Sequence, residues 1–293
     1  MERLRSECIT CLLKNQLSKV PEGITEEEKI EYLQKMFSIL AAVPRTMSAP
    51  EIVSEINELK RDMFQIEDEF GEIKRHFNQV MMEYEEEIGK KIRSAEDPLK
   101  LALQYAMVGN YIDFGAMQNV DEKYLTDLLG NASEINVDGE QYSMLKDDLT
   151  KGENFVLLTD NCGEVVMDKL LISEIKREFP NLQITVLVRG KEVLNDATMM
   201  DAEQIGLTDI VEVKGNGSGI AGTCLEKISD EARSIIDRAD VIIAKGQGNF
   251  ETLRGCGLNV YYAFLCKCDM FAGVFNVERF TGMLVNDKYA GIL

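Results

Sequence analysis

Five short runs of apolar residues, rich in β-branched and aromatic side chains, restrict the possible folds of this chain more than any other feature. They occupy positions 155–159, 184–188, 210–213, 241–244 and 260–264. Helix-length amphipathic segments, such as 165–179 and 225–239, separate several of these runs. Strands that alternate with helices form parallel sheets through right-handed crossovers. The pattern therefore predicts an α/β domain with a doubly wound, Rossmann-like and mostly parallel sheet.

The first part of the chain, from residue 1 to about 130, has helical periodicity and no strand-like run. Thr25 lies three residues before Glu28, a spacing typical of a capping box at the start of a helix. The apolar face of a further helix is formed by Ile52, Ile56, Leu59 and Met63. We therefore expect an all-helical domain at 1–135, followed by the α/β domain at 136–293.

Composition limits the partners of this protein. Its 293 residues carry a formal net charge of −19, which argues against nucleic acid or an anionic membrane as a partner, since both require a basic face. No apolar run approaches the roughly 20 residues that span a bilayer, and the N-terminus lacks the apolar stretch of a signal peptide. We therefore expect a cytoplasmic protein whose seven cysteines are free thiols or metal ligands. The sequence does not indicate the oligomeric state.

Polar residues directly follow several of the predicted strands. Asp160 and Asn161 come after the first run, Asp196 after the second and Lys245 after the fourth. In open α/β sheets, ligands bind beyond the carboxyl ends of the strands. Carboxylate and amide oxygens suit a hard divalent cation, whereas an ammonium group and backbone N–H groups suit a phosphoryl group. The pattern predicts a metal or phosphate site at this edge, with a helix that starts near Asn249.

A purely structural interpretation of the same residues is available. Asp and Asn at a strand end are commonly helix N-caps, and glycine-rich stretches such as 215–219 are commonly turns. Polar clusters after several successive strands are harder to explain in this way, because turns alone do not require them. Their joint occurrence therefore favours a binding site.

Three strings of the α/β part are distinctive: TDNCGE at 159–164, RGKEVLNDAT at 189–198 and ADVIIAKGQGNFETL at 239–253. They resemble the DUF89 family of metal-dependent damage-control phosphatases, which have the ARMT1-like fold. The helical part is similar to the same family at Cys8-x-x-Cys11 and in the segments 68–74 and 109–114. The resemblance covers nearly the whole chain and is strongest to the compact prokaryotic subgroup.

The resemblance implies a divalent metal ion held by Asp160, Asn161 and Asp196. Oxygen ligands favour Mg²⁺ or Mn²⁺, whereas Co²⁺ or Ni²⁺ often binds such sites more tightly. The ion would act as a Lewis acid and activate water for attack on a small phosphomonoester, such as a sugar phosphate or a damaged phosphometabolite. Asp196 or Glu164 could orient that water, and a covalent role for Asp160 is the alternative.

The same resemblance extends to the phosphate and to the helical part. It implies that Lys245 is the main phosphate ligand, next to Gly246, Asn249 and Glu251. Asn110 and Asp113 would contribute from the helical domain, which would place the site between the two domains. Relatives often carry Asp-Pro-Tyr ahead of the helical lysine, whereas this chain has Asp-Glu-Phe at 68–70. This departure leaves the role of Lys74 open.

Two other classes of function compete with a phosphatase. The sequence G-x-G-x-x-G at 217–222 matches the dinucleotide fingerprint and suggests a Rossmann-type nucleotide-binding enzyme, although the fingerprint normally follows the first strand. A non-catalytic metal-binding protein is the second alternative. Cys8 and Cys11 have zinc-site spacing and Cys266 and Cys268 would complete four ligands, but buried free thiols are also common.

Overall fold

The computed structural model of this protein describes residues 3–65, 70–113 and 120–290. The chain forms two compact units, Met1–Glu69 and Phe70–Leu293, which we call the N-terminal and C-terminal units and describe separately. Of the Asp-Glu-Phe segment discussed above, positions 68 and 69 lie outside the described residues. None of the described helices is both long enough and apolar enough to cross a membrane.

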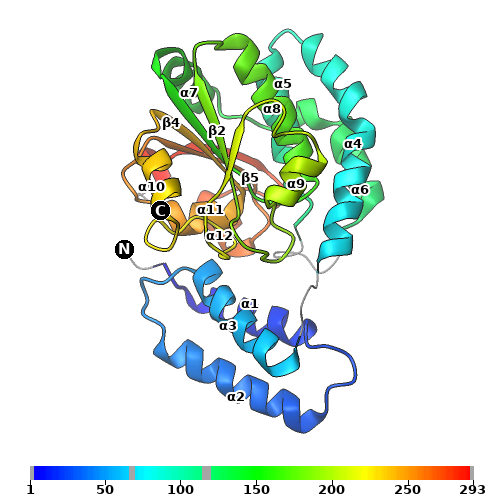
Figure 1. The fold of residues 1–293 in the computed structure, drawn as a ribbon, viewed down its shortest axis with the longest axis vertical. Helices are drawn as coiled ribbons and strands as arrows, with labels where there is room; N and C mark the ends of the chain where they lie inside the picture. The colour runs from blue at the N-terminus through cyan, green and yellow to red at the C-terminus, as the bar shows by residue number, and fades with distance from the viewer. Residues whose placement is uncertain (1–2, 66–69, 114–119, 291–293) are drawn as a thin grey trace. The chain divides into compact units, whose positions relative to one another are not determined.

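Within residues 3–65, the N-terminal unit forms the helices α1 (Ser6–Ser18), α2 (Glu26–Ala42) and α3 (Ala49–Phe64) (Figure 1). A polar network crosses its interior, because the Tyr32 hydroxyl donates to Gln16 at 3.0 Å and the Gln16 amide donates to Asn57 at 3.3 Å. The apolar core around this network is formed by Leu12, Tyr32, Met36, Ile52 and Ile56. The described elements of this unit are all helices, as the periodicity of the sequence predicts, whereas a helical domain at 1–135 remains a prediction.

The predicted capping box at the start of α2 is present. The Glu28 N–H donates to Thr25 Oγ1 at 3.3 Å, and the Thr25 N–H donates to Glu28 Oε2 at 2.8 Å. We expect Thr25→Ala to lower the free energy of unfolding by about 1 kcal/mol, because one helix N–H loses its acceptor. Chemical unfolding followed by circular dichroism measures this change. Ser38→Ala on the same helix is the control, and equal effects of the two variants would argue against a capping role.

The C-terminal unit is a mixed α/β structure built on one six-stranded, mostly parallel sheet. Its strands lie in the order β3-β2-β1-β4-β5-β6, and only the β5–β6 pair is antiparallel. The strands are β1 (Asn154–Leu158), β2 (Gln183–Val188), β3 (Glu212–Gly215), β4 (Val241–Lys245), β5 (Val260–Leu265) and β6 (Gly282–Asn286). The five predicted strands are thus confirmed to within about two residues, whereas β6 was not predicted.

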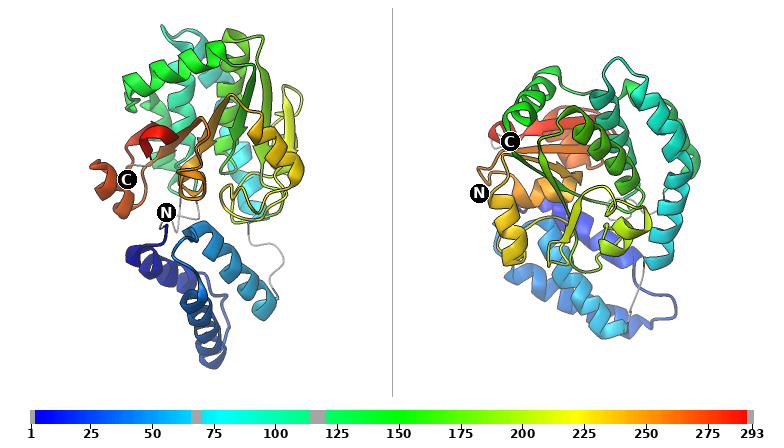
Figure 2. Two further views of the ribbon diagram at one scale, coloured as in Figure 1. Left: turned by 90° about the vertical axis from the view of Figure 1, so that its left-hand side faces the viewer. Right: turned by 45° about the horizontal axis from the view of Figure 1, so that its top comes forward.

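Alternate residues of the central strands face two separate apolar cores. Phe155, Leu157 and Ile243 belong to one core, and Val156, Leu158 and Ile242 belong to the other. The first core includes side chains of α4 (Gly71–Arg93), α5 (Pro98–Gly109), α6 (Glu122–Gly130), α7 (Gly139–Lys151), α8 (Glu164–Glu178) and α9 (Met199–Gln204). The second includes α10 (Asp230–Asp237), α11 (Gly246–Leu253) and α12 (Asp269–Phe275). The sheet is therefore covered by helices on both faces (Figures 1 and 2).

Two short helical elements complete the unit, η1 (Ala132–Glu134) after α6 and α13 (Asp287–Ala290) after β6. Helices α4 to α7 belong to the same compact unit as the sheet, because they pack on it around the first core. The division into compact units therefore falls after Glu69, far before the first strand, which begins at Asn154. A domain boundary at 135/136 remains a prediction.

The strand order determines where loops can meet. The chain proceeds from β1 to β2 and β3 on one side and then returns to β4 and β5 on the other. The carboxyl ends of the adjacent strands β1 and β4 therefore open side by side at the point where this direction reverses, which is where such sheets bind ligands.

Candidate functional site

The loops after β1 and β2 are joined to each other at the carboxyl edge of the sheet. Asn161 and Asp196 form an antiparallel β-bridge. On either side of it, the Ala197 N–H donates to the Asp160 carbonyl at 2.7 Å and the Cys162 N–H donates to the Asn195 carbonyl at 2.8 Å. Residues 35 positions apart are thereby held in register. The predicted metal ligands Asp160, Asn161 and Asp196 do come together.

The Asp160 side chain is the centre of this group. Its Oδ2 accepts hydrogen bonds from the amides of Asn161 at 2.7 Å and Asn110 at 3.0 Å. Its Oδ1 accepts from Arg189 at a longer distance of 3.4 Å. Asn110 follows α5, so the predicted contribution of this helical residue to the site is consistent with the geometry.

Arg189 was not among the residues predicted for the site. It directly follows β2, and its side chain is completely buried between the two aspartates. Its Nε donates to Asp196 at 2.6 Å, and its Nη1 contacts Asn249 at 3.4 Å. The sequence contained one indication of a site role for Arg189. This arginine directly follows an apolar strand and lies within the RGKEVLNDAT string, so it is placed at the edge of the sheet where ligands bind.

Burial sets the acidity of the two aspartates. It raises the pKa of Asp160 well above the ordinary value, and the neighbouring carboxylates of Asp196, Glu164 and Asp113 raise it further, against Arg189. Burial likewise raises the pKa of Asp196 to about 6, although Arg189 opposes the rise. Ionised carboxylates therefore repel each other here, and additional positive charge would stabilise them.

The donor set of the site fits a hard divalent cation. Asp196 Oδ1 and Asn161 Oδ1 accept no hydrogen bond from the residues that the structure describes, and Asp160 Oδ1 accepts only the long one from Arg189. These are three oxygens on adjoining loops. Within the described ranges, no group of three or more Cys, His, Asp or Glu side chains could hold a metal ion. A cation here would accordingly depend on two carboxylates, one amide oxygen and water.

Lys245 lies in a buried charge cluster. Its ammonium group donates to Glu164 and Asp168 at 2.6 Å each and to the Ala106 carbonyl at 3.0 Å, and all three charged side chains are inaccessible. Its three N–H groups are thus all used within the protein. A phosphate oxygen would have to replace one of these acceptors. Asp168 Oδ2 is buried without a hydrogen-bond partner among the described residues.

Helix α11 starts at Gly246, earlier than the predicted start near Asn249. Gly246 has φ +79°, and a Cβ atom at this position would overlap the Asp160 carboxylate. The first N–H groups of a helix have no partner within it, and Lys245 at the N-cap supplies no side-chain acceptor. The positive end of α11 therefore adjoins Asp160.

Asn249 is buried one turn into α11, and its polar atoms are used by the protein. Its amide donates to the carbonyls of Thr159 and Lys245 at 3.0 and 2.6 Å, and its oxygen accepts from Thr223 at 2.8 Å. These bonds connect the loops after β1, β3 and β4. The geometry favours a role in positioning for Asn249 over direct contact with a ligand.

Asp113 and Glu251 contribute further negative charge. Asp113 is paired with the buried Lys267, another residue that was not predicted. Burial raises the pKa of Glu251 to about 7, with a further contribution from Asp113 and opposition from Arg254. Asp113 also raises the pKa values of both Asp160 and Asp196. The predicted site residues therefore act electrostatically on one another.

The glycine-rich segment 217–222 does not have the context of a dinucleotide fingerprint. The next helix, α10, begins only at Asp230. A Cβ atom at Gly217 would contact Ser229, and one at Gly222 would overlap the Gly248 carbonyl. Close packing between loops thus accounts for these glycines.

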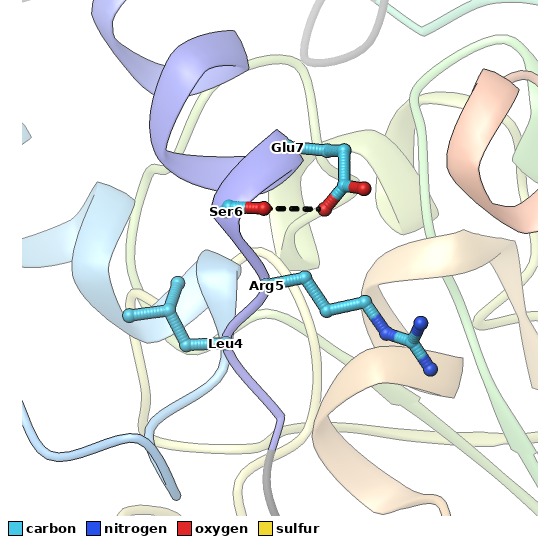
Figure 3. Close-up of a pocket in the computed structure, with 4 residues that line it drawn as sticks. All are labelled: Leu4, Arg5, Ser6 and Glu7. Atoms are coloured by element: carbon cyan, nitrogen blue, oxygen red, sulfur yellow. Dashed lines mark hydrogen bonds between the residues drawn. The ribbon is translucent and has the colours of Figure 1, made fainter.

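The N-terminal unit contains none of the residues predicted for the phosphatase site. A hollow of about 320 Å³ at the start of α1 is lined by Leu4, Arg5, Ser6 and Glu7, which Figure 3 shows as sticks. The Ser6 hydroxyl donates to the neighbouring Glu7 carboxylate at 3.0 Å, so this hollow is lined by a local surface contact (Figure 3). No disulfide bond is present among the residues that the structure describes.

Comparison with known proteins identifies the family. A family model described as the damage-control phosphatase ARMT1-like domain matches residues 4–282. The chain belongs to this family. The resemblance found in the three sequence strings is thereby confirmed.

Individual members of the ARMT1-like family match along their full length. A protein of Archaeoglobus fulgidus named damage-control phosphatase is 29% identical over 98% of both chains. A protein of Pyrococcus horikoshii that is also named damage-control phosphatase is 28% identical over 98% of this chain and 99% of its own. The crystal structure of a DUF89 family protein from P. horikoshii has a TM-score of 0.83 at 25% identity, covering 98% of this chain and 99% of that one.

Proposed function

We propose that this protein is a metal-dependent phosphatase that hydrolyses small phosphomonoesters, such as sugar phosphates or damaged phosphometabolites. The observation that carries the proposal is the convergence of Asp160, Asn161 and Asp196 at one edge of the sheet in a chain of the ARMT1-like family. Relatives named damage-control phosphatases that match over 98% of this chain support the reaction class.

We infer that the cation is held by Asp160, Asn161 and Asp196. The oxygen donors on their joined loops suit Mg²⁺, Mn²⁺, Co²⁺ or Ni²⁺. A bound cation would supply Lewis acidity toward a phosphoryl oxygen and lower the pKa of a water molecule. Arg189 would keep the two carboxylates oriented, since its guanidinium contacts both of them.

The phosphate group is proposed to bind beside the start of α11. The N–H groups that follow Lys245 point along the helix axis toward the anion, and the helix dipole favours negative charge there. Gly246 lets the backbone approach Asp160 closely. Lys245 would contribute as a phosphate ligand only by releasing one of its acceptors, and otherwise adds long-range positive charge. Glu251, Asn249, Asn110 and Asp113 complete the surroundings.

Of the two residues considered for orienting the attacking water, Asp196 has the better geometry. Glu164 uses Oε1 for Lys245 and Oε2 for the amides of Asn110 and Asn161. Asp196 keeps Oδ1 free of hydrogen bonds from the described residues, and because this oxygen is also the one offered to the cation, it would orient a water molecule next to that cation. A side chain must have an unused acceptor to receive a proton from water.

The proposed class of sheet is the doubly wound, Rossmann-like one. The strand order, with the chain returning from β3 to β4 next to β1, supports this class, as do the helices on both faces. It also accounts for a site at the ends of β1 and β4.

The test is phosphate release by chelator-treated protein from p-nitrophenyl phosphate and a panel of sugar phosphates, with and without each of the four cations. We expect turnover to require a cation and to disappear in Asp160→Ala. Asp209→Ala, on the turn before β3, is the control and should retain full turnover. Absence of turnover with every cation would exclude the proposed reaction for these substrates, and turnover in Asp160→Ala would exclude its role.

A further inference from the structure

Helix α4 carries a buried asparagine that contacts both loops of the site. Asn78 is completely inaccessible. Its Oδ1 accepts from the Gly163 N–H at 2.6 Å, two residues after Asn161. Its amide donates to Asp201 at 2.9 Å and to Gln204 at 2.8 Å, on the helix that follows the Asp196 loop. One side chain thus connects the two segments that bear the proposed metal ligands.

Lys74 lies one helical turn before Asn78 and makes further contacts with the second loop, the one after β2 that bears Asp196. Its ammonium group is paired with Asp201 at 2.8 Å and with Glu192 at 2.7 Å, and it lies 3.4 Å from the Thr198 hydroxyl. Glu192 and Thr198 lie on either side of Asp196 in the sequence. The loop is therefore attached to α4 both before and after its ligand.

The first loop also packs closely against the backbone of α4. Gly163 has φ +68°, and a Cβ atom there would lie 3.2 Å from the Phe77 carbonyl and closer still to the Ile112 side chain. The chain turns from the Asp160 loop into α8 at this point. This contact fixes the distance between the helix and the first loop, while Asn78 and Lys74 connect that helix to the second.

We propose that Asn78 and Lys74 are positioning residues that hold the two ligand-bearing loops at the separation required for metal binding, an inference that rests on the proposed function. The loops are joined to each other by backbone hydrogen bonds and by Arg189, and α4 adds an attachment of both loops to one helix. Groups behind metal ligands characteristically determine affinity by orienting those ligands. Neither Asn78 nor Lys74 makes a hydrogen bond or ion pair with Asp160, Asn161 or Asp196 within the described contacts, so Asn78 acts through the loops. Lys74 does so too, and its charge also lowers the pKa of Asp196.

The test measures binding of Mn²⁺ alone to the full chain by titration calorimetry, without substrate, in wild type, Asn78→Ala and Asn286→Ala. Asn286 is the matched control, because it is equally inaccessible and its side chain is also hydrogen-bonded, to Asn259 and the Lys288 N–H, where Asn78 makes three such bonds. Asn286 is the last residue of the edge strand β6. We expect both variants to have lower melting temperatures. Only Asn78→Ala should bind Mn²⁺ at least about tenfold more weakly than wild type.

The outcomes separate this inference from the proposed function. Equal Mn²⁺ affinity of Asn78→Ala and wild type would overturn the positioning role alone. Failure of wild type to bind Mn²⁺ would overturn the metal site and the positioning role together. If Asn78→Ala does not fold, Lys74→Gln serves in its place, with the same weakening expected and unchanged affinity counting against the proposal.

Discussion

Lys245→Met is expected to lower the free energy of unfolding by about 3–5 kcal/mol, because it removes the positive partner of two buried carboxylates. Glu164 and Asp168 each contact the Lys245 ammonium at 2.6 Å, and none of the three side chains is exposed. Methionine keeps the length of the side chain, so the loss of stability measures the effect of removing the charge and not that of creating a cavity. Urea unfolding at neutral pH measures it.

The control for Lys245→Met is Lys214→Met, which removes an exposed lysine paired with Glu231 at 3.3 Å. Exposed pairs contribute about 0–1 kcal/mol, so this variant should be close to wild type. Equal stability of the two variants would mean that Glu164 and Asp168 are not ionised together in the folded protein.

The loss in Lys245→Met should also depend on pH. Burial already raises the pKa of Asp168 to about 7, although Lys245 opposes the rise. Between this value and the unfolded pKa of about 4, the folded protein binds more protons than the unfolded one, so stability falls as pH rises. Without Lys245 the raised pKa would rise further. We therefore expect the variant to lose less stability relative to wild type at pH 5 than at pH 8.

Gly246→Ala is expected to reduce metal-dependent turnover by about 100-fold or more, because displacement of a reacting group by about 1 Å can have an effect of this size. The new methyl group would overlap the Asp160 carboxylate, so the carboxylate or the start of α11 must move. The positive φ of +79° adds backbone strain of about 1 kcal/mol or more. Phosphate release and chemical unfolding measure the two effects separately.

Gly257→Ala is the matched control for Gly246→Ala. Gly257 has nearly the same φ, +77°, but nothing lies within 4 Å of the position of its Cβ atom. Gly257→Ala should lower the free energy of unfolding because of the strained backbone, and it should change turnover little. Similar turnover in the two variants would argue against the close approach of α11 and Asp160 as a requirement for activity.

The convergence of Asp160 and Asp196 could be predicted from the sequence, because it follows from topology. Asp160 and Asp196 come directly after or shortly after apolar runs, and parallel strands bring their carboxyl ends to one edge. The β6 strand could not be predicted in the same way. Its five residues, Gly282–Asn286, include a glycine and contain no long β-branched run, and they pair with β5 only through tertiary contacts.

The surroundings of Lys245 also could not be predicted from local pattern. A lysine after a strand normally suggests an accessible cation, and only the three-dimensional packing of α5 and α8 places a carbonyl and two carboxylates around it. The burial of Arg189 has the same origin. Pairing between charges distant in sequence leaves no periodic signal, so sequence analysis named Lys245 without the two carboxylates paired with it, and it did not name Arg189 or Lys267.

The position of Arg189 between Asp160 and Asp196 implies an order of events. With both carboxylates ionised, this group of three carries one net negative charge and would repel the dianion of a phosphate ester. A divalent cation would convert the excess to one positive charge, which attracts such a dianion. Metal would thus bind before substrate, and a metal-free protein would show little affinity for phosphorylated metabolites.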